Sequence, residues 1–383
     1  MPSCTMDVVH DRHVMGLFMP RNDRLLLMLL LGAGLLAGWV PLRAYSEPIR
    51  VKDQRGHLLE LSAPAERIVT IPIPMAAVVM ALDGSSRRLV AMHPTALKSI
   101  QEGFLKRVFP EALSIRSDIV RGGQFNPNVE SVLELRPDLV VQWTQPEVLI
   151  KTLERAGLRV AGLINSPPTQ AINERNLTIM AELIGRKNRV RTLLATHHEV
   201  HGKIEAISKT IPTRDRPRVL YLRSMTRSMR PAGAHTYNDF WIQLAGGVNV
   251  AAATLKGLRA AVNDEQLVVW NPEVVFLGAF DHATPDDFLR NPVLAQVEAV
   301  KNRRVYKMPH GGYRWDPGSH ESHLTWQWVA QLLHPQRFDF DLRAAMAESY
   351  RFLYRYELAD REIDDILQMQ VNGEMTGYDR FKK

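Results

Sequence analysis

Cysteine is almost absent from this chain of 383 residues, and the one cysteine is Cys4. It precedes an apolar run from Leu25 to Val40. A chain processed after this run would contain no cysteine, which excludes disulfides, a thiol nucleophile and a thiolate metal site. A lipoprotein needs a cysteine just after such a run, and none stands there. We therefore expect an unlipidated protein.

The sequence also lacks the motifs of common enzymes. No G-x-G-x-x-G or G-K-[ST] phosphate loop occurs, and Ser319 lacks the glycine that a nucleophile elbow requires two places later. His198 and His201 flank Glu199 but stand one residue closer together than in a zincin helix. His197 and His201 have a metal-compatible spacing, although a solvated helix face explains them better. We expect no enzyme activity, no cofactor and no metal site.

Basic residues exceed acidic ones, with 48 Lys and Arg against 41 Asp and Glu, a formal charge of +7 and a pI near 9.5. The positive residues are spread along the chain, and no basic run is interleaved with aromatic residues. This distribution does not favour nucleic-acid binding.

The first 46 residues have the pattern of a secretory signal. Arg21 and Arg24 precede the apolar run, and the small residues Ala44 and Ser46 follow it at the positions that a signal peptidase reads. The run is short for a membrane span, which needs about 20 residues, so an uncleaved anchor is the alternative. We predict cleavage near Glu47.

One long helix is predicted from Arg186 to Ile211. Its apolar residues recur with a period close to 3.6, no proline interrupts it, and Pro212 ends it. At about 1.5 Å per residue it would reach roughly 35 to 40 Å, the diameter of a small domain. A helix of this length is expected to span two lobes.

A repeat flanks this helix. The segments 130–141 and 265–276 each begin with a glutamate and continue with a proline seven residues later, an acid and an apolar strand. Each half also begins with an arginine before an apolar strand, Arg67 or Arg218. The pattern predicts βαβ units, hence an α/β fold of two Rossmann-like lobes with parallel sheets joined by a single long helix. The predicted parts are a signal peptide (1–46), an N-terminal lobe (47–168), helices including the linker (169–211), a C-terminal lobe (212–308) and a closing loop with C-terminal helices (309–383).

Loops at the carboxyl ends of parallel strands are the expected place for a ligand. Trp143 ends one predicted strand, and Arg223 and Arg227 follow another. Arginines in such loops suit a carboxylate, a phosphate or another oxyanion, because guanidinium offers a planar fork of donors. The alternative is a solvated basic loop.

Several short motifs, taken in order, resemble the periplasmic substrate-binding proteins of ABC importers, in the class for iron siderophores, haem, cobalamin and molybdate. That class has two lobes joined by one long helix. The resemblance covers about residues 48 to 356. The motifs that carry it are Val69 with the Pro72 to Pro74 turn, Asn126 to Val140, Leu244 to Val250, Glu265 to Val275, Ala299 to Tyr306, and Trp315 to Pro317 with Glu321 and Ser322.

The resemblance implies roles for two pairs of residues. Glu130 and Glu265 match the exposed glutamate of each lobe that forms salt bridges with arginines of the two permease subunits. Gln124 and Arg259, six residues before each glutamate, match pocket positions that are aromatic in the cobalamin-binding relative. Polar and cationic residues there put a corrin in doubt and favour an anionic ligand.

The resulting hypothesis is binding rather than catalysis. A monomer diffusing freely in the periplasm would deliver a ferric siderophore, haem or a related anionic metal species to a permease dimer with its cytoplasmic ATPase. The alternatives are molybdate, tungstate or cobalamin as cargo, a chelatase-like enzyme on the same fold, and a zinc or manganese binder using histidines. The expected ligand residues are Gln124, Trp143, Arg223, Arg227, Tyr237, Arg259, Tyr313 and Trp315.

Overall fold

The computed structural model describes residues 48–121, 125–226, 228–258 and 260–383. Residues Glu47–Lys383 form one compact unit. The predicted signal segment lies outside the described residues. Within the described part of the chain, no helix is long and apolar enough to cross a membrane.

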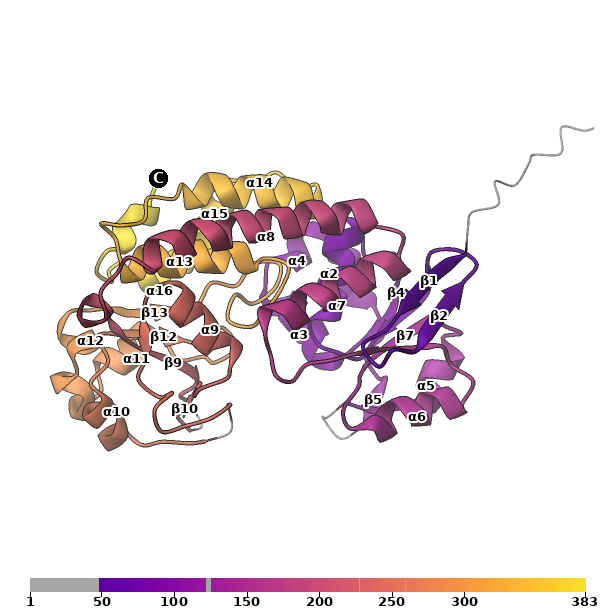
Figure 1. The fold of residues 1–383 in the computed structure, drawn as a ribbon, viewed down its shortest axis with the longest axis horizontal. Coiled ribbons are helices and arrows are strands. Elements are labelled where there is room, and N and C mark those ends of the chain that lie inside the picture. Colours follow the sequence, from indigo (N-terminus) through magenta and orange to yellow (C-terminus); the bar gives the residue numbers. More distant parts are fainter. Residues whose placement is uncertain (1–47, 122–124, 227, 259) are drawn as a thin grey trace, which may run out of the picture. The chain divides into compact units, whose positions relative to one another are not determined.

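The predicted long helix is α8 (Lys187–Ser208), with 22 residues. It lies along α7 (Gln170–Leu183) and α13 (Ser322–Leu333), and also contacts α9 (Tyr237–Leu244). Figure 1 shows α8 running above both sheets. Along the described chain, the last strand of the first sheet is followed by α7 and α8 and then by the first strand of the second sheet, and no other strand-to-strand connection joins the two sheets. This confirms the predicted connection by one long helix.

The first lobe is built on a parallel sheet in the order β4 (Leu89–Met92), β3 (Ile68–Thr70), β7 (Leu139–Trp143), β8 (Val160–Leu163). All residues of β3, β7 and β8 are buried. Strands covered on both faces read as continuous apolar runs, which is why the sequence predicts them well.

The second lobe repeats this arrangement. The strands β9 (Arg218–Ser224), β12 (Val274–Leu277) and β13 (Val305–Lys307) are parallel, and β11 (Val248–Asn249) pairs with the start of β9 on its other side. Counting the parallel strands of each lobe, the second pairs with the first, the first pairs with the third, and the third pairs with the fourth. The strand β10 (Arg230–Pro231) adds an antiparallel pair at the end of β9.

A repeated set of contacts explains the sequence repeat in the first lobe. Arg136 takes a positive φ of 45° just before Pro137. The Asp138 carboxylate accepts the backbone N–H groups of Glu66 (2.7 Å) and Arg67 (3.0 Å), and the Arg67 side chain donates to the Arg136 carbonyl at 3.2 Å. The acid after the proline thus fixes the start of β3 beside the start of β7.

The second lobe has the same set of contacts between the acid after the proline and the start of its first strand. Asn271 has a φ of 42° before Pro272, and the Glu273 carboxylate accepts the backbone N–H of Arg218 at 2.8 Å. The Arg218 side chain donates to the Asn271 carbonyl at 3.0 Å. The acid and the arginine recur in the sequence because each lobe joins its first and third strands in this way.

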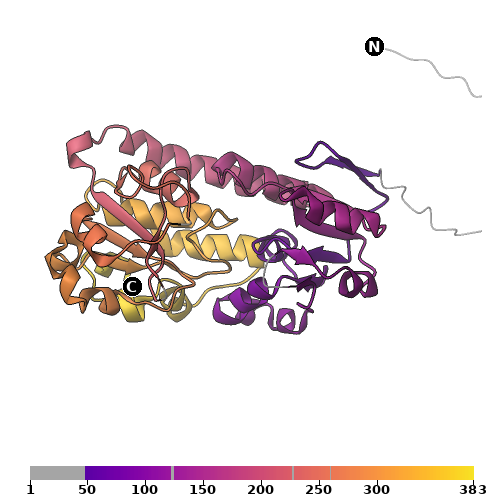
Figure 2. The same cartoon turned by 90° about the horizontal axis from the view of Figure 1, so that it is seen from below.

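Before the first sheet, β1 (Ile49–Lys52) pairs antiparallel with β2 (Leu58–Leu61) in a hairpin. The C-terminal helices α13 and α14 (Leu342–Tyr354) extend beside α8 toward the first lobe (Figure 2). The remaining elements are α2 (Met75–Asp83), α3 (Pro94–Glu102), α4 (Leu105–Val108), β5 (Val120–Arg121), β6 (Asn126–Pro127), α5 (Val129–Glu134), α6 (Glu147–Arg155), α10 (Asp264–Trp270), α11 (Pro285–Leu289), α12 (Glu298–Lys301), α15 (Asp360–Ile366) and α16 (Met369–Asn372), with 3₁₀ turns at Pro110–Ser114, Thr213–Asp215, Pro292–Gln296 and Tyr378–Phe381.

Candidate ligand-binding cleft

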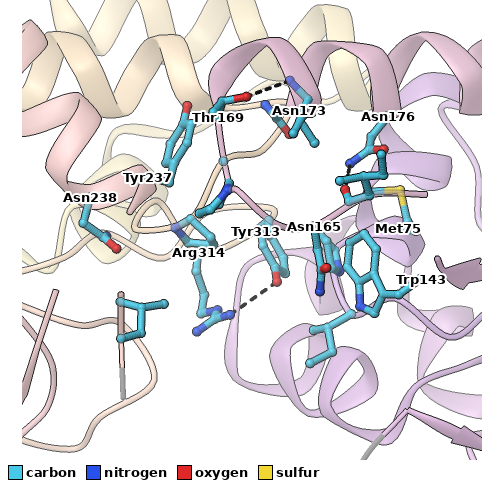
Figure 3. Close-up of a pocket in the computed structure, with 18 of the residues that line it drawn as sticks. Met75, Trp143, Asn165, Thr169, Asn173, Asn176, Tyr237, Asn238, Tyr313 and Arg314 are labelled. Carbon is cyan, nitrogen blue, oxygen red and sulfur yellow. Dashed lines mark hydrogen bonds between the residues drawn. The ribbon is translucent and has the colours of Figure 1, made fainter. Parts of the chain in front are cut away.

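A cavity of about 370 Å³ lies between the two lobes and is lined by residues of both lobes and of the start of α7. This volume falls within the range of small-molecule sites in proteins. Figure 3 shows side chains from both lobes and from the start of α7 around it. The labelled lining residues are Met75, Trp143, Asn165, Thr169, Asn173, Asn176, Tyr237, Asn238, Tyr313 and Arg314.

Three of the predicted ligand residues, Trp143, Tyr237 and Tyr313, lie on this cavity. Trp143 is at the carboxyl end of β7, and Tyr237 begins α9. These three aromatic residues, together with Phe125 and the residues from Ile73 to Met75 at the start of α2, give the cavity mainly apolar walls. Gln124, Arg227 and Arg259 lie outside the described residues.

Trp315 and Arg223 are placed elsewhere. The Trp315 side chain is fully buried, and its indole N–H donates to the Glu321 carboxylate at 3.0 Å. Trp315 therefore supports the loop behind Tyr313 and does not line the cavity. Arg223 is exposed and lines a neighbouring basic hollow.

Arg314 is a lining residue that the sequence analysis did not select. Its side chain is 16% exposed, and its guanidinium carbon lies 3.6 Å from the centroid of the Phe280 ring. It donates to the Tyr313 hydroxyl at 3.3 Å, and its ion-pair distance to Asp316 is 3.9 Å. Its Nε–H has no partner among the described residues. The only sequence signal was its place in an aromatic, polar loop after the last strand.

Other buried polar atoms at the cavity lack partners within the described chain. The Trp143 indole N–H has none, although Trp143 is only 6% exposed. Asn176 donates to the Ile164 carbonyl at 2.9 Å, while its own side-chain oxygen accepts nothing. Leaving a buried donor unsatisfied costs about 1 to 3 kcal/mol, so such groups call for an explanation, and a ligand supplies one.

Tyr237 is a neutral donor at the opposite wall. Its hydroxyl lies 2.8 Å from the Gln170 side-chain oxygen and 2.9 Å from the Ser322 hydroxyl. Burial raises the pKa of its phenol. The Tyr237 hydroxyl already donates within the protein. The cavity therefore combines one guanidinium, the unpaired Trp143 indole N–H and aromatic surface, a combination suited to an anion with apolar parts or to a small oxyanion.

A second hollow, of about 570 Å³, adjoins the first through Arg314. Lys98, Arg223 and Arg230 line it, together with one carboxylate, Asp281. Burial raises the pKa of that carboxyl, but hydrogen bonds from Met225, Thr226 and Ala283 lower it to a net value of about 2. Asp281 is thus ionised and already bonded, and the hollow has a positive balance of formal charge.

Glu130 and Glu265 both stand in the first turn of a short helix, in α5 and α10. The Glu130 side chain is 84% exposed and pairs with Arg121 at 3.0 Å. Glu265 is also exposed. Each lobe therefore presents one acid at an equivalent place in the repeat.

The histidines of α8 differ from expectation. His197 is fully buried rather than on a solvated face, and its Nε2 lies 3.1 Å from the His320 carbonyl. Burial lowers its pKa to about 4. His201 stacks on Phe240 with ring centroids 6.0 Å apart. Among the described residues, no three His, Cys, Asp or Glu side chains are grouped so that they could hold a metal ion.

Comparisons with known proteins agree with this fold. The family model for the periplasmic binding protein matches residues 89–310. A crystal structure of a periplasmic solute binding protein from Veillonella parvula has 30% sequence identity and a TM-score of 0.78, and the alignment covers 85% of this chain and 98% of that one.

Two relatives carry names that specify a ligand. The molybdate-binding protein MolA of Haemophilus influenzae is 25% identical over 78% of this chain and 93% of its own length. Its molybdate-bound structure, described as cognate to an ABC transporter, has a TM-score of 0.71. The ferric enterobactin-binding periplasmic protein FepB of Escherichia coli is 25% identical over 75% of this chain and 92% of its own length. These relatives are binding proteins rather than enzymes. The chain belongs to the periplasmic binding protein family.

Proposed function

We propose that this protein binds an anionic metal species in the cleft between its lobes and delivers it to an inner-membrane ABC permease. The observation that carries the proposal is the Arg314 guanidinium at the aromatic cavity, with an Nε–H that has no partner among the described residues. The nearest carboxylate, Asp316, is 3.9 Å away and accepts the Tyr221 hydroxyl at 2.6 Å. A ligand anion would complete the surroundings of this cation.

The cargo is an iron complex, such as a ferric siderophore or haem, or a metal oxyanion, such as molybdate or tungstate. The named relatives include binders of molybdate and of ferric enterobactin. The aromatic cavity and the adjoining basic hollow would hold apolar and charged parts of a large chelate, whereas Arg314 with the unpaired donors would hold a small oxyanion. Direct binding experiments separate these cargoes.

A thermal-shift screen of residues 47–383 tests the proposal. Ferric siderophores, haem, cobalamin, molybdate and tungstate form the panel, with sulfate, zinc and manganese salts as controls. A ligand at a hundred times its Kd adds about 2.7 kcal/mol to the free energy of unfolding. We expect a shift with an iron chelate, haem, molybdate or tungstate and none with the controls. Stabilisation by zinc or manganese alone, or by no member of the panel, would refute an anionic metal cargo.

We also propose that Glu130 and Glu265 dock on two arginine-bearing subunits of the permease. A two-fold symmetric partner presents the same surface twice, which suits one exposed acid at the equivalent place in each lobe. Charge reversal of both, Glu130→Lys with Glu265→Lys, is expected to abolish uptake and to leave ligand affinity unchanged. Glu199→Lys on α8, also exposed, is the matched control. Normal uptake by the double variant would remove the docking assignment.

The remaining proposals concern the chain as exported. We propose cleavage of residues 1–46 near Glu47, an unlipidated monomer in the periplasm, and the division into 47–168, 169–211, 212–308 and 309–383. For protein recovered from the periplasm, the intact mass tests the cleavage site and the absence of a lipid, and sedimentation tests whether the protein is a monomer. A retained N-terminal segment, a lipid adduct or a stable dimer would contradict them.

A further inference from the structure

Glu321 is a fully buried carboxylate surrounded by donors. It accepts the backbone N–H of Gly312 at 3.1 Å and of Tyr313 at 3.5 Å. It also accepts the Trp315 indole N–H at 3.0 Å and the Tyr354 hydroxyl at 2.7 Å. A buried carboxylate is unfavourable unless hydrogen-bond donors surround it. Glu321 has such a set of donors, and the same hydrogen bonds hold in place the residues that supply them.

That partner is the loop from Pro309 to Gly318. Three of the four donors come from its residues Gly312, Tyr313 and Trp315, and the loop carries the cavity residue Arg314. These hydrogen bonds fix the backbone of Gly312 and Tyr313, just before Arg314, and the side chain of Trp315, just after it. Because both neighbours of Arg314 are fixed, the guanidinium is held near the cavity even though its own ion pair is long, at 3.9 Å.

Two glycines allow the loop to approach this closely. A Cβ at Gly311 would meet the Tyr350 hydroxyl and the Glu321 carboxylate, and a Cβ at Gly312 would meet the Tyr354 hydroxyl. The same Gly312 N–H also reaches the Tyr350 hydroxyl at 2.9 Å. Both tyrosines belong to α14, so the C-terminal region packs directly against the loop.

We propose that Glu321 is the positioning residue of the ligand cleft, holding Tyr313 and Arg314 in place from behind, with α14 completing its surroundings through Tyr354. The step from loop position to ligand affinity rests on the proposed function. Both Glu321 and α14 lie beyond residue 310, where the match to the family model ends. Glu321 and α14 thus take part in binding without touching the ligand.

Two variants weaken the cluster in different ways. Glu321→Gln keeps the shape but replaces one acceptor oxygen by a donor that faces other donors. Tyr354→Phe removes one donor, and with it the 2.7 Å contact to His320, which Glu321→Gln retains. The matched control is Tyr378→Phe, which removes a buried hydroxyl that contacts Trp328 and Asn372 and neither Glu321 nor the cavity.

Hydrogen–deuterium exchange of the segment 309–318 in the ligand-free protein measures the effect on the loop. Loss of a hydrogen bond to a charged group should speed local exchange by about tenfold or more in both variants. Titration with molybdate and with a ferric siderophore then measures affinity, expected to fall by a similar factor for whichever ligand the wild type binds. Tyr378→Phe should change neither quantity by more than about twofold, whatever its effect on melting temperature.

The two measurements separate the hypotheses. Unchanged exchange in both variants, or an equal increase in Tyr378→Phe, would overturn the positioning role. Faster exchange with unchanged affinity would show that the loop is held by Glu321 but that its position does not govern binding, which also overturns the proposal. If the wild type binds neither probe, molybdate and the ferric siderophore are refuted as cargo, and the exchange data still decide whether Glu321 holds the loop.

Discussion

Replacement of Arg314 by methionine is the most direct perturbation of the cleft. Methionine keeps an unbranched apolar stem that can still pack on Phe280, where the guanidinium carbon lies 3.6 Å from the ring centroid. The substitution removes the charge and the unpaired Nε–H. It therefore tests the cation itself rather than the shape of the cavity.

The expected loss of affinity follows from the contacts of Arg314. A hydrogen bond to a charged group contributes about 1.5 to 3 kcal/mol, which corresponds to about 10- to 150-fold in Kd. We expect the upper part of this range, because the side chain is only 16% exposed and solvent screens it weakly. Stability should also fall, since Asp316 loses its nearby cation and keeps the Tyr221 hydroxyl as a partner.

Isothermal titration of wild type, Arg314→Met and Arg223→Met with the ligand found in the screen measures how much each arginine contributes to ligand affinity. Arg223 is exposed and lines the basic hollow rather than the aromatic cavity, so Arg223→Met removes one positive charge at the other candidate site. Arg314→Met should lose affinity at least about fivefold more strongly than Arg223→Met. Equal affinities for wild type and Arg314→Met would refute the reasoning, and a larger loss in Arg223→Met would move the anion site to the basic hollow.

Two further predictions concern stability. Asp138→Ala and Glu273→Ala each remove the acid that fixes the first strand of a lobe, and each should lower the free energy of unfolding by about 1 kcal/mol or more in denaturant titrations. Glu134→Ala, at an exposed acid, is the control. An effect no larger than that of Glu134→Ala would contradict this prediction. Burial lowers the pKa of His197 to about 4, below its ordinary value of 6.5, so the unfolded chain binds more protons and stability should fall as pH drops from about 6.5 toward 4. His197→Gln should flatten that dependence between pH 7 and 5 relative to wild type, and an unchanged slope would exclude His197 as a source.

The sequence by itself determined the architecture. The 3.6-residue period and the terminal Pro212 predicted a helix from Arg186 to Ile211, and α8 spans Lys187–Ser208. Continuous apolar runs predicted the buried parallel strands. The repeated acid after proline predicted two similar halves, and in each half that acid bonds to the backbone N–H that begins the first strand. These features depend on residues that act within one element or between neighbouring elements.

The placement of individual side chains needed the tertiary structure. His197 lies on a polar helix, but α13 covers its face and brings His323 to a ring-centroid distance of 5.1 Å. Trp315 looked like a cavity wall and is buried, because the Glu321 carboxylate holds its indole N–H from behind. No pattern within α8 or the loop specifies which distant helix will cover it.

Arg314 shows the same limit at the candidate site. Arginines after β9 were expected to meet the ligand because they follow a strand, and strand ends share one edge of a sheet. Arg314 follows no strand directly and reaches the cavity through a loop whose course depends on Gly311, Gly312 and Glu321. Periodicity and turn chemistry fix elements and their order, whereas long-range packing and buried hydrogen bonds decide which side chains of an irregular loop face the cleft.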